Sequence, residues 1–140
     1  MSQELSTKDI AREIYVILYS KRKNEQRIMI KTYFDVNAVL EEPIIYVQGH
    51  EAIIRQFLLM ATIFISITTE IYSITDSVIA GDHHIVTIDA IIKYRLPLKP
   101  ILFRQEIELR TITKFEFNEQ KKIVRHEDIW RSRLDSLQIN

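Results

Sequence analysis

The sequence predicts an α+β fold, with three N-terminal helices packed on one face of a strongly curved, mixed but mostly antiparallel β-sheet. Helical spacing of apolar residues dominates the first half of the chain, and long alternating segments dominate the second half. With 140 residues and no composition break or internal repeat, residues 1–140 form a single domain. A chain of this length buries enough surface to fold without disulfides or a metal.

The first helix is predicted over residues 7–22. Ser6, followed by Asp9, forms a box that caps a helix. Ile10, Ile14 and Leu18 then recur on one face. The basic run at 21–23 is either a solvated helix end or an anion patch, and the zero net charge favours the solvated end. A second, shorter helix is predicted over residues 25–34.

Two short strands, 39–40 and 44–47, are predicted around the Glu42-Pro43 interruption, and Gly49 then turns the chain into a third helix over 50–64. Four strand segments follow. We expect them over residues 68–80, 84–96, 101–117 and 121–134, with hairpin turns at Gly81-Asp82 and at 118–121 and a connection at 97–100.

The last segment, KKIVRHEDIW, has an unusual pair of faces. With a period of two, one face carries Val124, His126, Asp128 and Trp130. The other face carries Ile123, Arg125, Glu127 and Ile129. If Trp130 points inward, a histidine and an aspartate point inward with it, and a buried pair of this kind needs hydrogen-bond partners.

Composition excludes several functions. There is no cysteine, and neither of the two glycines belongs to a phosphate-binding loop or a nucleophile elbow. Nineteen basic residues balance 19 acidic ones, so neither nucleic acid nor an anionic membrane is expected as the main partner. The apolar run 57–67 is too short to span a bilayer, and the polar N-terminus has no signal-peptide core. We therefore expect a cytoplasmic protein, with the nucleus as the other possible compartment.

The segment YFDVNAVLEEPIIYVQGHEAIIRQF resembles the signature of the nuclear transport factor 2-like superfamily, which includes ketosteroid isomerase and the SnoaL-like polyketide cyclases. The final hairpin, FEFNEQKKIVRHEDIW, is similar to the closing hairpin of the same superfamily, most of all in its SnoaL-like branch. The resemblance implies a cone whose helices close one side of the curved sheet around an internal pocket. It also implies a homodimer through the convex sheet face, which would carry Ile85, Ile91, Ile112, Ile123 and Ile129.

The resemblance makes Glu42 the candidate general base, because the acid before this proline shuttles protons in ketosteroid isomerase. A carboxyl at the mouth of an apolar cavity also has a raised pKa. The other interpretation is a turn residue that faces solvent. The isomerase needs a second acid near Leu109, Arg110 or Thr111, and none of these carries a carboxyl, so isomerase activity itself is not expected.

His126 and Asp128 are the other candidate catalytic residues, as an acid–base dyad or as a structural hydrogen-bonded pair. The expected ligand is small and apolar, and five aromatic residues would line its pocket: Tyr15, Tyr19, Tyr33, Phe57 and Trp130. No cofactor is expected, and no metal, since His126 and Asp128 lack a third ligand. The alternative function is a non-catalytic dimerisation or assembly module whose own side chains fill the cavity.

Overall fold

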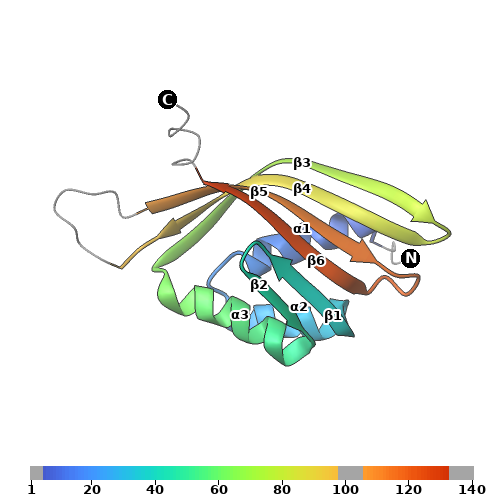
Figure 1. The fold of residues 1–140 in the computed structure, drawn as a ribbon, viewed down its shortest axis with the longest axis horizontal. Helices are drawn as coiled ribbons and strands as arrows, with labels where there is room; N and C mark the ends of the chain where they lie inside the picture. The colour runs from blue at the N-terminus through green and yellow to red at the C-terminus, as the bar shows by residue number, and fades with distance from the viewer. Residues whose placement is uncertain (1–4, 98–105, 133–140) are drawn as a thin grey trace.

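Three helices cover one face of a six-stranded sheet in the computed structural model of the chain, which describes residues 5–97 and 106–132 (Figure 1). The predicted α+β architecture is confirmed. The elements in chain order are α1 (Thr7–Leu18), α2 (Lys23–Tyr33), β1 (Phe34–Glu42), β2 (Ile45–Gln48), α3 (His50–Ile63), β3 (Ser66–Ala80), β4 (His83–Arg95), β5 (Glu106–Phe117) and β6 (Ile123–Ser132). Residues 98–100 of the predicted connection 97–100, the start of a strand at 101–105 and the strand end at 133–134 lie outside the described residues.

The strand order is β2-β1-β6-β5-β4-β3, with β2 and β3 at the edges, so the sheet is not closed. Strands β1 and β6 run parallel, and the other neighbours run antiparallel. The sheet bends over the helices, as Figure 1 shows. This topology places β6, with its histidine and aspartate, in the interior of the sheet between β1 and β5.

Helix α1 begins as predicted and ends four residues earlier. The Ser6 hydroxyl accepts a hydrogen bond from the Asp9 amide at 3.1 Å and caps its N-terminus. At the other end, the buried Gln26 amide donates to the carbonyl oxygens of Ile17, Leu18 and Ser20. These carbonyls lack helical partners, and their satisfaction by Gln26 ends the helix at Leu18.

Strand β1 is longer than the predicted pair 39–40. It starts at Phe34, directly after α2, and runs to Glu42. Its length follows from its place between two neighbours, since it pairs with β2 on one side and β6 on the other. Gly49 then starts α3 with a φ of 92°, a left-handed conformation that glycine adopts without steric cost.

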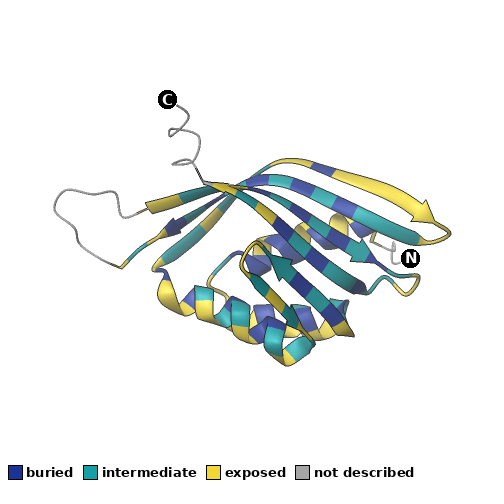
Figure 2. Ribbon diagram, in the orientation of Figure 1, coloured by how far each residue is buried: buried dark blue, intermediate teal, exposed yellow. Residues whose placement is uncertain are grey.

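Burial alternates along the central strands, as the dark and light bands of Figure 2 show. On β4, Val86, Ile88, Ala90, Ile92 and Tyr94 face the helices, as the sequence pattern predicts. On β5, Thr111, Thr113, Phe115 and Phe117 do the same. The opposite face of β4 and β5 carries surface ion pairs, including Arg110 with Asp89.

The predicted outward position of Ile123 is wrong, because Ile123 is fully buried in the core. The pairing of β5 with β6 is irregular at this point: Glu116 lies opposite Arg125, but Phe117 lies opposite Ile123. Val124 is thus an extra residue, a bulge that reverses the alternation. From Arg125 onward the predicted faces hold, and His126 and Asp128 are buried while Ile129 is exposed.

No helix in the described part of the chain is long and apolar enough to cross a bilayer.

Candidate functional site

Tyr19 stands at the centre of a buried hydrogen-bond network that joins α1 to the sheet. Its hydroxyl lies 3.0 Å from Nε2 of His126 and donates to Oδ2 of Asp128. The other carboxylate oxygen, Oδ1, accepts from the Thr113 hydroxyl at 2.6 Å and lies 3.2 Å from Nε2 of His126. Because His126 and Asp128 are two residues apart on β6, both side chains meet the same helix.

The other ring nitrogen of His126, Nδ1, is buried without a hydrogen-bond partner among the described residues. Aromatic rings surround the imidazole: the centroids of Phe115, Phe57 and Phe34 lie 4.6, 5.8 and 6.0 Å from its own. The hydrogen bonds of the imidazole therefore all lie at Nε2, toward Tyr19 and Asp128.

Asp128 is the charged member of the network. Burial raises the pKa of this carboxyl, but the interaction with His126 and the hydrogen bonds from His126, Thr113 and Tyr19 outweigh burial and hold the pKa below its ordinary value. Asp128 is therefore a carboxylate inside the protein, stabilised by donors from α1, β5 and β6.

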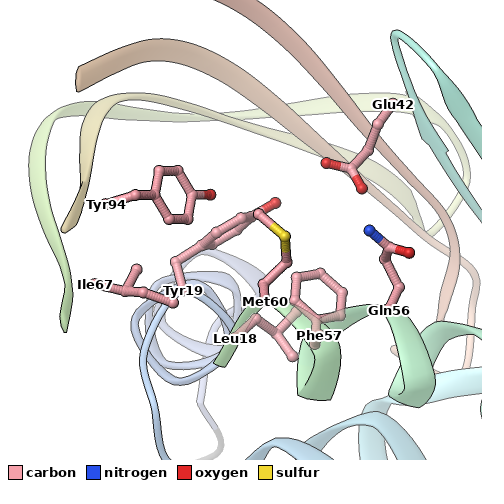
Figure 3. A pocket seen from close by; sticks show the side chains of 8 residues that line it. All are labelled: Leu18, Tyr19, Glu42, Gln56, Phe57, Met60, Ile67 and Tyr94. Atoms are coloured by element: carbon pink, nitrogen blue, oxygen red, sulfur yellow. The ribbon is translucent and has the colours of Figure 1, made fainter. Parts of the chain in front are cut away.

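A small cavity lies on the other side of Tyr19, between the helices and the sheet (Figure 3). Its volume of about 10 Å³ is room for one water molecule. The lining residues come from five elements and are Leu18, Tyr19, Glu42, Gln56, Phe57, Met60, Ile67 and Tyr94. In Figure 3 the Glu42 carboxyl group and the phenol oxygens of Tyr19 and Tyr94 converge on it.

Glu42 is the acidic group of this cavity. It ends β1 just before Pro43, and its side chain turns inward, whereas its neighbour Glu41 forms an ion pair with Arg125 at 2.7 Å. Burial, followed by the charge of Asp128, raises the pKa of Glu42 to about 7, against a smaller opposing effect of His126. A carboxyl with this pKa exchanges a proton near neutral pH, as a general acid or base must.

Tyr94 supplies the second phenol of the cavity. Burial raises its pKa well above the ordinary value, and the charges of Asp128 and Glu42 raise it further. The same causes, burial first and then Asp128, raise the pKa of Tyr19. Both phenols therefore keep their protons at all ordinary pH values.

The structure brings together some of the residues that the sequence nominated, but not all of them. Glu42, Tyr19 and Phe57 line the cavity, whereas His126 and Asp128 lie behind Tyr19 and do not. Tyr15, fully buried, bonds the Thr111 hydroxyl at 3.2 Å. Tyr33 packs on the edge of the core and Trp130 is half-buried, and neither lines the cavity.

Five lining residues were not predicted from the sequence: Leu18, Gln56, Met60, Ile67 and Tyr94. Tyr94 had a signal, since it is the only hydroxyl-bearing side chain among the inward positions of β4. Gln56 had none, because a glutamine beside Phe57 on a helix is most often solvated. No three His, Cys, Asp or Glu side chains gather into a metal site in residues 5–97 and 106–132.

Several solved structures share this fold. An epoxide hydrolase/cyclase-like enzyme, SalBIII of salinomycin pyran ring formation, superposes with a TM-score of 0.70 at 18% identity, covering 92% of both chains. An LEH-like epoxide hydrolase of Mycobacterium tuberculosis gives 0.65 at 14% identity, covering 94% of this chain and 83% of its own. A protein of Jannaschia sp. CCS1, assigned as a SnoaL-like polyketide cyclase, gives 0.64 at 14%, covering 97% and 94%.

No model of a known protein family and no curated protein sequence matches the chain. At these identities the structural comparisons establish the fold alone.

Proposed function

Because the chain has the nuclear transport factor 2-like fold, in the form shared with SnoaL-like proteins, we propose that it binds a small, largely apolar ligand in the cavity beside Tyr19. We assign it acid–base chemistry of the lyase, isomerase or cyclase type on that ligand. The observation that carries the proposal is the Glu42 carboxyl group, which faces an otherwise mostly apolar cavity and has a pKa of about 7.

Glu42 takes the role of catalytic acid or base in this proposal. As a carboxylate it removes a proton from a ligand atom in the cavity, and as the acid it returns one. The ligand atom must come within hydrogen-bond reach of the carboxyl, which the shared cavity allows.

His126 and Asp128 take the role of positioning residues, because they reach the cavity only through Tyr19. Two hydrogen bonds fix the Tyr19 oxygen, so that it presents one orientation to a ligand. Tyr94, which also lines the cavity, offers a hydroxyl donor to a ligand oxygen.

The comparisons agree with an enzymatic role of this kind. The similar structures are described as an LEH-like epoxide hydrolase, an epoxide hydrolase/cyclase-like enzyme and a SnoaL-like polyketide cyclase. Their low identity means that substrate and residue roles do not carry over to this chain.

The size of the cavity favours a second candidate, a non-catalytic assembly module whose side chains fill its interior. Room for one water is far below the volume of pockets that hold drug-sized ligands. Binding in the first candidate therefore requires side chains to move. Met60 is the natural one, since its unbranched chain changes rotamer easily and it stands on the cavity wall.

Native mass spectrometry of the purified protein, followed by a fragment screen read by amide NMR shifts, separates the two candidates. The first predicts fragments that shift the residues lining the cavity and that lose affinity in Phe57→Trp, which fills the cavity further. The second predicts no fragment that shifts these residues in the folded protein. Leu59→Trp, on an exposed position of α3, is the matched control.

A further inference from the structure

The lining of the cavity offers oxygen atoms and aromatic rings, and no cation. None of its eight residues is a lysine, an arginine or a histidine, as far as the described residues go. A carboxylate or phosphate group of a ligand would find no opposite charge there. Removing such an anion from water without a partner is strongly unfavourable.

Two carboxyl groups lie around the cavity. Asp128 lies directly behind Tyr19, where the interaction with His126 offsets part of its charge. Glu42 adds a second carboxyl from the opposite wall. The nearby cation on β6, Arg125, is engaged with Glu41 and Glu127. A low-dielectric site beside two carboxyl groups attracts positive charge.

The aromatic side chains of the cavity wall also favour a positively charged ligand. Tyr19 and Phe57 meet edge to face, with centroids 5.6 Å apart and an interplanar angle of 84°, and Tyr94 adds a third ring. A cation that lies against the face of such a ring is attracted by the ring quadrupole. An ammonium group is also about as large as a water molecule, so its charged head fits a cavity of about 10 Å³ without enlargement.

We infer that the ligand of this cavity is a protonated primary amine with a small apolar body, whose ammonium group lies among Glu42, Tyr19 and Tyr94. The inference rests on the proposed function, because it names the chemical class of ligand for the same site. The ammonium hydrogens have acceptors in the Glu42 carboxylate and the phenol oxygens, and the apolar body lies against Phe57, Met60 and Ile67.

Binding of a cation is coupled to the protonation state of Glu42. Burial and Asp128 raise the pKa of this carboxyl, so at neutral pH a large fraction is uncharged. An ammonium beside it favours the carboxylate, so affinity rises as the pH rises through about 7. The other titratable groups around Glu42 are Tyr19 on α1, Tyr94 on β4, and His126 and Asp128 on β6. Gln56, Phe57 and Met60 of α3 do not titrate.

Three probes with one apolar body and different charges test the inference: isopropylammonium, 2-propanol and isobutyrate. Each is titrated into the full chain at pH 5 and pH 8, and amide NMR shifts of the lining residues report binding. The expected result at pH 8 is an affinity for isopropylammonium about tenfold above that for 2-propanol, from charge and cation–π attraction, with no measurable binding of isobutyrate. The preference shrinks at pH 5 and in Glu42→Gln.

Glu41→Gln is the matched control, because the neighbouring carboxyl faces Arg125 and does not line the cavity. It keeps the preference for the amine. Equal or tighter binding of 2-propanol or isobutyrate at the lining residues overturns the inference and leaves the proposed ligand site standing. If none of the three probes shifts the amide resonances of the lining residues, the inference and the proposed ligand site are both overturned.

Discussion

At the scale of single residues, two neighbouring glutamates have opposite surroundings. Glu41 pairs with Arg125 on the outer face of the sheet, whereas Glu42 faces the cavity and the charge of Asp128. The acid before the proline was the sequence candidate for a base, and its inward position supports that role, which remains a prediction. Sequence could nominate Glu42 by resemblance, but only the fold distinguishes the inward carboxyl from the outward one.

Replacing Glu42 should change how stability depends on pH. Its pKa is raised from 4.5 to about 7 in the folded protein, so the folded state holds the proton that the unfolded state releases between these values. The wild type therefore loses stability from Glu42 as pH rises from about 4.5 to 7. Urea unfolding should show Glu42→Gln gaining stability relative to wild type between pH 4.5 and 8. If Glu42→Gln changes the free energy of unfolding equally at pH 4.5 and pH 8, or if Glu41→Gln shows the same gain, the raised pKa of Glu42 is contradicted.

Replacing Asp128 should destabilise the chain strongly. Asp128→Ala removes the carboxylate that Tyr19, Thr113 and His126 share, which costs about 3–5 kcal/mol in urea unfolding at pH 7. The control Asp89→Ala breaks an exposed pair with Arg110 and costs about 0–1 kcal/mol. Similar losses in both variants would show that the network does not support the fold.

The same network should sense acid. Because the pKa of Asp128 is lower when folded than the ordinary value of 3.8, its contribution is present above pH 3.8 and is lost as pH falls through the folded value. The free energies of unfolding of the wild type and of Asp128→Asn should therefore converge at pH values below the folded pKa of Asp128. A difference that stays constant down to pH 2 would contradict the lowered pKa.

At the scale of elements, helix positions and the alternation on β4 could be predicted, because each depends on residues near in sequence. Gly81, at the turn between β3 and β4, and Ser6, which caps the N-terminus of α1, are local signals of this kind. The bulge at Val124 could not be predicted, because it arises where β6 leaves its register with Phe117 on β5. The roles of Tyr94 and Gln56 were missed for a similar reason, since the five elements that line the cavity meet only after folding.

Alanine substitutions on β6 test the bulge. Ile123→Ala should cost about 2–5 kcal/mol, because it opens a cavity in the packed core. Ile129→Ala, at a side chain that is 49% exposed, should change the free energy of unfolding of the monomer by less than about 0.5 kcal/mol. Equal costs measured by chemical denaturation would indicate a regular strand with Ile123 outward.

At the scale of the whole molecule, the dimer expected from the sequence stays a prediction. With Ile123 withdrawn into the core, the convex face keeps Ile85, Ile91, Ile112 and Ile129, and Ile112 lies directly opposite Ile129 on the neighbouring strand. Light scattering after size exclusion should give a dimer mass for wild type and a monomer mass for Ile129→Glu. The control Ile28→Glu, exposed on α2, should stay a dimer. A monomeric wild type at high concentration would contradict the prediction.

The proposed chemistry depends on one carboxyl group inside one cavity, and a carbon-13 NMR titration of the Glu42 side chain measures the pKa of that group directly. The resonance is assigned by its loss in Glu42→Gln. We expect a titration midpoint near pH 7 that moves down in Asp128→Asn, since the charge of Asp128 raises it. A midpoint near the ordinary value of 4.5 would contradict the proposed role of Glu42, because the carboxyl would then be solvated and the cavity would have no acid–base group.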